Sequence, residues 1–147
     1  MATMQGTTHT IDKLNGLLKG EISAVETYRQ ALEKVTDPSI AKELECAKTC
    51  HSGRVAELVS KVQEAGGEPA QSSGAWGAFA KMMEGGAKVA GDKAAIAVLE
   101  EGEDKGLADY KNLLEDSDPA VKMTAQALIS KQEGTHQIMR DLKKRMN

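Results

Sequence analysis

The sequence predicts an all-α protein: one antiparallel four-helix bundle with a long crossover between its second and third helices. Ala, Leu, Glu, Lys and Met are abundant, whereas aromatic residues make up only 3% of 147 residues, which leaves little material for a sheet. Apolar residues recur at steps of three and four along four stretches. A two-helix pattern with an Asp-Pro turn also occurs twice.

The first helix is predicted to run from about Ile11 to Val35. Residues 1–10 are expected to form a flexible N-terminal tail, and residues 11–147 a single domain, because a chain of this length can bury one core. Glu21 takes the one remaining step of an apolar stripe that faces the bundle interior. The apolar members of that stripe are Leu14, Leu18, Val25, Tyr28, Leu32 and Val35.

The second helix is predicted to begin at Pro38, with Asp37 as its cap, and to run to about Ala65. The Gly-Gly-Glu-Pro run at residues 66–69 ends it. Residues 68–91 are predicted to form the crossover, which contains a short amphipathic helix packed on the bundle. The large apolar residues of the crossover are Trp76, Phe79, Met82 and Met83.

The third helix is predicted from about Asp92 to Asp116, and Glu103 again lies on an apolar stripe. A second Asp-Pro turn at residues 118–119 then starts a fourth helix that runs to about Arg145. Two tight hairpins joined by one long crossover form a known topology of four-helix bundles.

Two segments of the chain repeat one another: GEISAVETYRQALE (residues 20–33) and GEDKGLADYKNLLE (residues 102–115) share Gly, Glu, Tyr, Leu and Glu at the same places. The repeat extends past each Asp-Pro turn. It therefore predicts two halves related by a pseudo-twofold axis, with Glu21 and Glu103 on partner helices near mid-height. A carboxylate buried there needs a partner, which can be a metal ion, a proton, or a lysine or arginine.

Glu133 and His136 supply the pattern Glu-x-x-His on the fourth helix. Residues three apart share one face of a helix, and a carboxylate with an imidazole suits iron, manganese or zinc. The pattern alone is weak evidence, because it arises often on surface helices. Combined with two glutamates on a repeat, it indicates a metal site formed by Glu21, Glu103, Glu133 and His136.

The segment LNGLLKGEISAVETY resembles the first helix of the ferritin-like superfamily, and QEGTH resembles the Glu-x-x-His of its fourth helix. EAGGEP, the Trp-containing crossover and AVLEEGEDKGLADY are similar to an uncharacterised family of small bacterial ferritin-like proteins associated with stress responses. This second resemblance covers about residues 11–115. It implies a ferritin-like bundle, and a di-iron site in the relatives that bind metal.

The two halves are unequal where a two-metal site needs a second Glu-x-x-His. Aligned on their Asp-Pro turns, the halves place Ser52 and Val55 opposite Glu133 and His136. We therefore expect one metal ion per chain rather than two, iron or another divalent metal, or none. Strong di-iron oxidase activity is not expected.

Two alternatives stay open. In the first, the bundle binds no metal and acts as an interaction module, with Lys48, His51 and the tyrosines satisfying the glutamates. A homodimer formed through a Met-rich surface is then expected, and any other protein partner is unknown. In the second, Cys46 and Cys50 carry thiol chemistry, although the sequence favours their being small buried apolar residues.

Charge and hydropathy argue against nucleic acid and membrane as partners. The net charge is −3 and the sequence pI about 5.7, so the chain has no large cationic surface for nucleic acid. No stretch approaches the roughly 18 apolar residues of a membrane span, and the N-terminus lacks the apolar core of a signal peptide. The sequence predicts a soluble, cytoplasmic protein.

Overall fold

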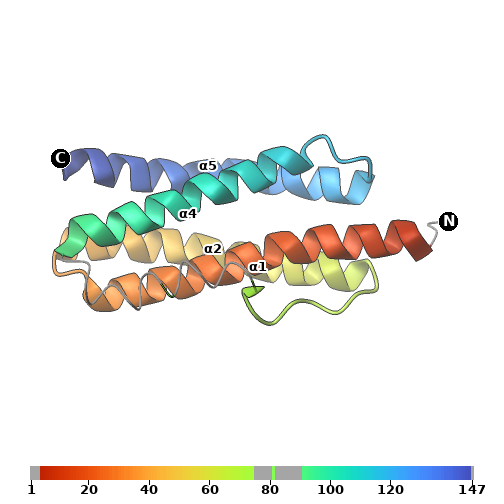
Figure 1. Cartoon of the computed structure of the whole chain (residues 1–147), viewed down its shortest axis with the longest axis horizontal. Helices are drawn as coiled ribbons and strands as arrows, with labels where there is room; N and C mark the ends of the chain where they lie inside the picture. Colours follow the sequence, from red (N-terminus) through yellow and green to blue (C-terminus); the bar gives the residue numbers. More distant parts are fainter. Residues whose placement is uncertain (1–3, 75–80, 82–90, 147) are drawn as a thin grey trace.

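The computed structural model describes residues 4–74, 81 and 91–146. Within these residues the secondary structure is helical, and the prediction of an all-α bundle is confirmed (Figure 1). No helix in the described part is long and apolar enough to cross a membrane. The four long helices are α1 (Met4–Lys34), α2 (Pro38–Glu64), α4 (Gly91–Leu113) and α5 (Pro119–Arg145).

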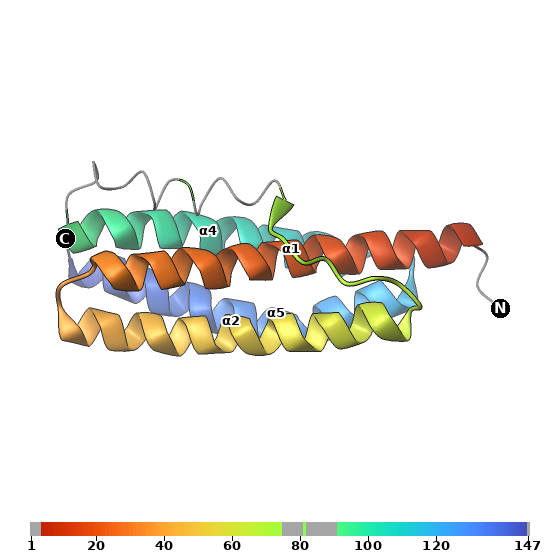
Figure 2. The same ribbon diagram turned by 90° about the horizontal axis from the view of Figure 1, so that it is seen from below.

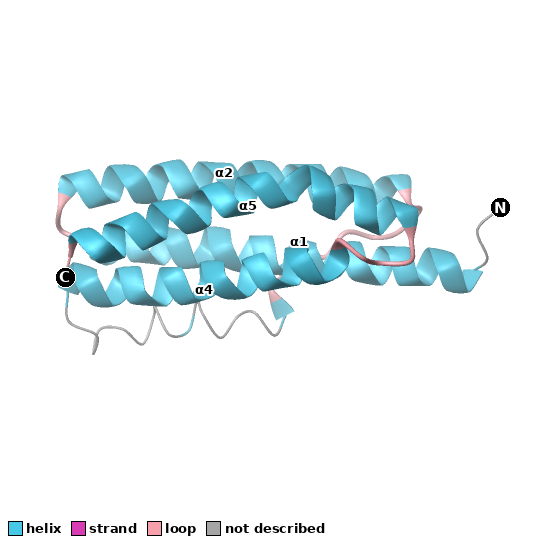
Figure 3. Cartoon of the chain, turned by 90° about the horizontal axis from the view of Figure 1, so that it is seen from above, coloured by secondary structure: helices cyan, strands magenta, loops and turns pink. Residues whose placement is uncertain are grey.

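The helices pack as two antiparallel hairpins, α1 with α2 and α4 with α5 (Figure 1 and Figure 2). The hairpins lie side by side, because α1 also contacts α4 and α2 also contacts α5. Short loops join the helices within each hairpin (Figure 3). This arrangement surrounds one interior with all four helices, as the predicted pair of hairpins requires.

The start of α1 differs from the prediction. The helix begins at Met4, so the part of the expected flexible tail that the structure describes is helical. Nε2 of His9 lies 2.9 Å from Oδ1 of Asp116, and the Thr10 hydroxyl donates a hydrogen bond to Asp118. Both partners belong to the turn between α4 and α5. The first turns of α1 are therefore held by tertiary contacts more than 100 residues away in sequence, which helical periodicity cannot reveal.

Both Asp-Pro turns start their helices at the predicted proline, but only Asp37 makes a side-chain capping hydrogen bond; Asp118 is the cap residue of α5 without one. The Asp37 carboxylate accepts a hydrogen bond from the backbone N–H of Ser39 at 2.8 Å, and Pro38 occupies the first helical position of α2. Pro119 takes the same place in α5. Gly66 has a φ of +85°, a left-handed conformation that glycine adopts readily and that ends α2.

The crossover is described only in part. Trp76, Phe79, Met82 and Met83, on which the prediction of a short helix depends, lie outside the described residues. The beginning of the crossover is tied to α1 by Asn15, whose side-chain amide donates to the Glu68 carbonyl at 3.0 Å and accepts from the Ala70 N–H at 2.8 Å. Asn15 thus fixes the direction in which the chain leaves α2.

The apolar core is divided into two clusters by a layer of buried polar side chains. One cluster contains Tyr28, Ala31, Ile40, Leu44, Ala47, Ala95, Ile96, Leu99, Met139 and Leu142. The other contains Leu14, Leu17, Leu18, Leu58, Val62, Tyr110, Ala125 and Leu128. Since each cluster draws on all four helices, the two cores hold the polar layer in place from both ends of the bundle.

Candidate functional site

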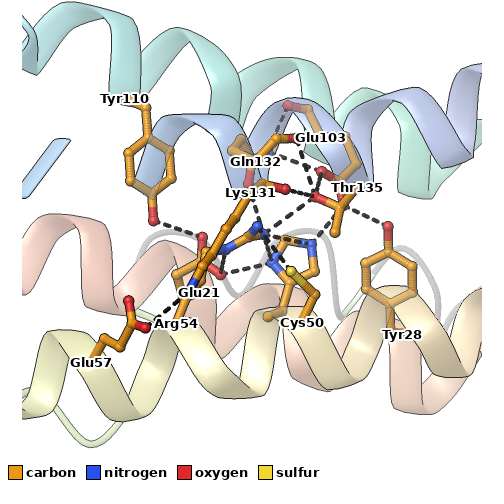
Figure 4. A network of polar contacts seen from close by, with 11 residues as sticks. Glu21, Tyr28, Cys50, Arg54, Glu57, Glu103, Tyr110, Lys131, Gln132 and Thr135 are labelled. Atoms are coloured by element: carbon orange, nitrogen blue, oxygen red, sulfur yellow. Dashed lines mark hydrogen bonds and ion pairs between the residues drawn. The ribbon is translucent and has the colours of Figure 1, made fainter. Parts of the chain in front are cut away.

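The polar layer is built from charged side chains on three helices. Glu21 comes from α1, His51 and Arg54 come from α2, and Glu103 comes from α4. The exposed fraction of each is 4% or less. A charge so deeply buried is costly unless it is paired and hydrogen-bonded, and Figure 4 shows this layer as a continuous network.

His51 bridges the two carboxylates. Its Nδ1 lies 2.7 Å from Oε2 of Glu21, and its Nε2 lies 2.6 Å from Oε2 of Glu103. Each ring nitrogen thus faces a carboxylate oxygen, an arrangement that favours the imidazolium form, in which both nitrogens donate. Burial opposes this charge, but Glu21 and Glu103 outweigh burial and raise the pKa of His51 to about 9.

Arg54 supplies a second buried cation. Its Nε donates to Oε2 of Glu21 at 3.0 Å, and its Nη2 donates to Oε1 of Gln132 at 2.9 Å. Burial would lower the pKa of Arg54, but Glu21 raises it overall, so the guanidinium stays charged. Nη2 also lies 2.5 Å from Nδ1 of His51. The two cations are thus in contact, and each depends on the carboxylates to offset the charge of the other.

Two tyrosines donate to the carboxylates in a crossed arrangement. The hydroxyl of Tyr28 on α1 donates to Oε2 of Glu103 at 2.5 Å, and that of Tyr110 on α4 donates to Oε1 of Glu21 at 3.0 Å. Burial and the nearby glutamates raise the pKa of both phenols, which therefore remain donors. Both tyrosines are buried and bond the glutamates, as the metal-free alternative expects of them.

The contribution of α5 differs from the prediction. Glu103 accepts hydrogen bonds at its Oε1 from Nε2 of Gln132 at 2.9 Å and from the Thr135 hydroxyl at 2.7 Å. Glu133 is exposed, and Nε2 of His136 lies 2.5 Å from Oδ1 of Asp104. The structure therefore brings Glu21 and Glu103 together but leaves Glu133 and His136 outside their network. One residue along a helix is a rotation of about 100°, so the inward pair is the one that precedes Glu133 and His136.

The same one-residue shift applies to α2. Ser52, which aligns with Glu133, is exposed, whereas the preceding His51 points into the bundle. Lys48, offered above as a partner of the glutamates, instead lies 3.7 Å from Glu45. Sequence reasoning missed Arg54 as well, along with Gln132 and Thr135. The signal that could have found them is the apolar stripe of each helix, since these positions continue it at steps of three and four.

The cysteines differ from their predicted burial. Cys46 is exposed and Cys50 is half-buried. Nη1 of Arg54 lies 3.6 Å from the Cys50 sulfur, so this thiol borders the polar layer. The interpretation of both cysteines as buried small apolar residues was wrong for Cys46, because its place on α2 faces away from the core.

A small cavity of about 40 Å³ lies between α1 and α4, with the polar layer at its floor. It has room for water, which needs roughly 10–15 Å³ per molecule by this measure. Gly20 and Gly102, which occupy matching places in the repeat, lie in its wall together with Gly106. A Cβ atom at position 106 would come within 2.7 Å of Nε2 of Gln132. The absence of a side chain there allows the Gln132 amide to reach Glu103.

Gly106→Ala is expected to lower the free energy of unfolding by about 1–3 kcal/mol, because the new methyl group must displace the amide that Glu103 and Arg54 share. Gly134→Ala on α5 is the matched control. A Cβ there meets nothing within 4 Å, so the gain in helix propensity should stabilise the protein by about 0.5–1 kcal/mol. Urea unfolding measures both values. If the free energy of unfolding changes with the same sign in the two variants, Gly106 is not as closely packed as described.

This arrangement does not fit a metal ion. All four oxygens of the Glu21 and Glu103 carboxylates accept hydrogen bonds, and His51 has no free ring nitrogen to offer as a ligand. The guanidinium of Arg54 cannot act as a ligand at neutral pH. In the part of the chain that the structure describes, no three or more His, Cys, Asp or Glu side chains are arranged to hold a metal. Two carboxylates and two protein cations already balance one another.

Residues 9–116 match the family described as a domain of unknown function, DUF2383. The chain belongs to this family. The matched part of this DUF2383 protein ends before α5, so it includes both glutamates and both cations but not Gln132 and Thr135. No curated protein matches the sequence.

The fold of the DUF2383 chain is similar to that of the bacterioferritin-related protein from Bacteroides fragilis, which is described as a dodecameric thioferritin. The two structures superpose with a TM-score of 0.72 at 16% sequence identity, over 92% of this chain and 84% of that chain. At this identity the likeness establishes the ferritin-like fold alone.

Proposed function

We propose that this DUF2383 protein is a non-catalytic, metal-independent ferritin-like bundle that serves as an assembly or interaction module. The bridging of Glu21 and Glu103 by His51 carries this proposal. A protein cation takes the place between the two carboxylates where a metal ion would otherwise be needed, and Arg54 adds the second positive charge. A network that is neutral and hydrogen-bonded on its own supplies stability without an exchangeable cofactor.

A degenerate metal site formed by Glu21, Glu103, Glu133 and His136 is the competing proposal. It has less support, because Glu133 is exposed and His136 lies against Asp104 rather than the buried glutamates. The stress association implied by the family resemblance, and a cytoplasmic location, remain part of the proposal as expectations.

Self-association is the kind of interaction we propose. The structural neighbour is described as dodecameric, which supports an oligomer without supporting a dimer in particular. Of the methionines from which the sequence suggested an interface, Met82 and Met83 lie outside the described residues. Among the described residues, Met123 is the one large apolar side chain that is mainly exposed, at 67%. Met139 is fully buried.

Metal content and oligomer mass test this function together. The purified chain, treated with EDTA and then incubated anaerobically with Fe(II), is expected to retain far less than one iron per chain by elemental analysis. Its oligomer mass, measured by light scattering after gel filtration, should be the same before and after iron is added. Glu103→Ala is the control. Iron near one per chain in the native protein, lost in Glu103→Ala, would overturn the proposal in favour of the metal site.

A further inference from the structure

We infer that the bundle keeps the geometric frame of a two-metal site, with its two ligand-pair positions at 51/54 on α2 and 132/135 on α5. In this frame the side chains of His51 and Arg54 fill the place of the metal ions. The inference deepens the proposed function and rests on it, because it identifies which residues made the interior independent of metal.

The spacing of the inward residues supports this assignment. Ferritin-like two-metal sites take one Glu from each of two helices and a Glu-x-x-His from each of the other two. Here Glu21 and Glu103 fill the first two places, on α1 and α4. The other two helices each present two inward residues three apart, and the pairs match under the alignment of the two Asp-Pro turns, His51 with Gln132 and Arg54 with Thr135.

Contacts between the helices also support the assignment of 51/54 and 132/135 as the ligand-pair positions. Thr135 and Gln132 reach the Glu103 carboxylate, and Arg54 reaches both Glu21 and Gln132. Side chains from four helices thus converge on one layer, which Figure 4 shows directly for the labelled residues. Glu133, which is exposed, and His136, which is half-buried against Asp104, make no contact of this kind.

The charges are consistent with an exchange of cations. Four carboxylates and two divalent ions sum to zero in a complete site, with the histidines neutral. In this chain two carboxylates remain, and an imidazolium with a guanidinium balances them. Neutral Gln132 and cationic His51 in the glutamate positions, together with cationic Arg54 in a histidine position, therefore keep the layer neutral without metal. A buried layer that stays neutral avoids the penalty of an uncompensated charge.

The test is to restore the ligands in the inferred register. The frame variant, defined as His51→Glu, Arg54→His, Gln132→Glu and Thr135→His with Glu21 and Glu103 unchanged, is expected to bind about two Co(II) per chain. Elemental analysis gives the stoichiometry, and the ligand-field absorption of Co(II) reports its coordination. The native chain is expected to bind far less than one.

The matched control tests the register suggested by the sequence. Ser52→Glu with Val55→His completes a second Glu-x-x-His in line with the existing Glu133 and His136, one residue away from the inward pair His51 and Arg54. Ser52 is exposed, and Val55 is half-buried against the apolar cluster that contains Leu58 and Val62. This control variant is expected to bind no more Co(II) than the native chain. If the control variant binds two Co(II), or the frame variant binds none, the inferred frame is wrong.

A folding measurement distinguishes a frame variant that cannot bind metal from one that does not fold. Far-ultraviolet circular dichroism with and without Zn(II) shows whether the frame variant folds alone or with metal, and folding driven by Zn(II) supports the inference. If it stays unfolded, the half variants His51→Glu/Arg54→His and Gln132→Glu/Thr135→His are each expected to bind one Co(II), and no binding by either would overturn the frame. Fe(II) uptake by the native chain tests the proposed function separately.

Discussion

His51→Gln is expected to lower the free energy of unfolding by about 3–5 kcal/mol, because it removes one cation from a buried network and leaves the two carboxylates with Arg54 alone. Stabilities of single domains are about 5–15 kcal/mol, so this loss is a large fraction of the total. Urea unfolding followed by circular dichroism at neutral pH measures it.

Two comparisons separate the charge effect from the loss of packing. Adding Glu103→Gln to His51→Gln removes the excess negative charge, so the double variant should regain a substantial part of the lost stability. Lys131→Ala removes an exposed ion pair with Glu57 and should cost less than about 1 kcal/mol. If the double variant is as unstable as the sum of its single changes, the two residues are not coupled by charge and the network described here is incorrect.

Raising the pH from about 6.5 to 9 is expected to lower the stability of the native chain by about 3 kcal/mol. His51 has a pKa of about 9 in the folded protein and 6.5 as its ordinary value, and each pKa unit corresponds to about 1.4 kcal/mol. Because the folded state binds the proton more tightly, the stabilisation is complete below pH 6.5 and is lost as the pH rises through 9. Unfolding curves at several pH values measure the slope.

The groups that face His51 determine the sign of this effect. Glu21 from α1 and Glu103 from α4 favour its charge, Arg54 from α2 opposes it, and α5 presents neutral side chains. The free energy of unfolding of the His51→Gln variant should therefore change little between pH 6.5 and 9. Glu21 has the opposite pH dependence. Its pKa in the folded protein is lowered from the ordinary value of 4.5, so the stability that its charge contributes is lost as the pH falls below 4.5. If the stability of the native chain instead increases from pH 6.5 to 9, His51 is not a protonated bridge between the two glutamates.

The fold could be predicted from the sequence because its signals are local. Asp37 and Pro38 start α2, Gly66 ends it, and the second Asp-Pro turn starts α5 at Pro119 as expected. Capping and backbone conformation depend on a few neighbouring residues, which a single sequence displays directly. The seven-residue Glu-Tyr spacing in each half likewise placed Glu21 and Glu103 at equivalent heights.

The candidate site could be predicted only in part. Both glutamates were found, and His51 was recognised as a possible partner, but Arg54, Gln132 and Thr135 were missed. The motif of Glu133 and His136 has the spacing of a ligand pair, but the α5 side chains that reach the Glu103 carboxylate are Gln132 and Thr135. A motif fixes the spacing of its residues along a helix but not the direction in which they point.

The sequence by itself determined the four long helices, their order, the starts of α2 and α5 and the symmetry between the two halves, because each depends on residues close together in the chain; the start of α1, which contacts the α4–α5 turn, was not among them. Only the tertiary structure decided the rotation of α2 and α5 about their own axes, and hence that His51 and Arg54 meet Glu21 and Glu103. That rotation is set by packing against two apolar clusters drawn from all four helices. A shift of one residue, about 100°, separates the Glu133 and His136 motif from the side chains of α5 that join the neutral ion network in the core.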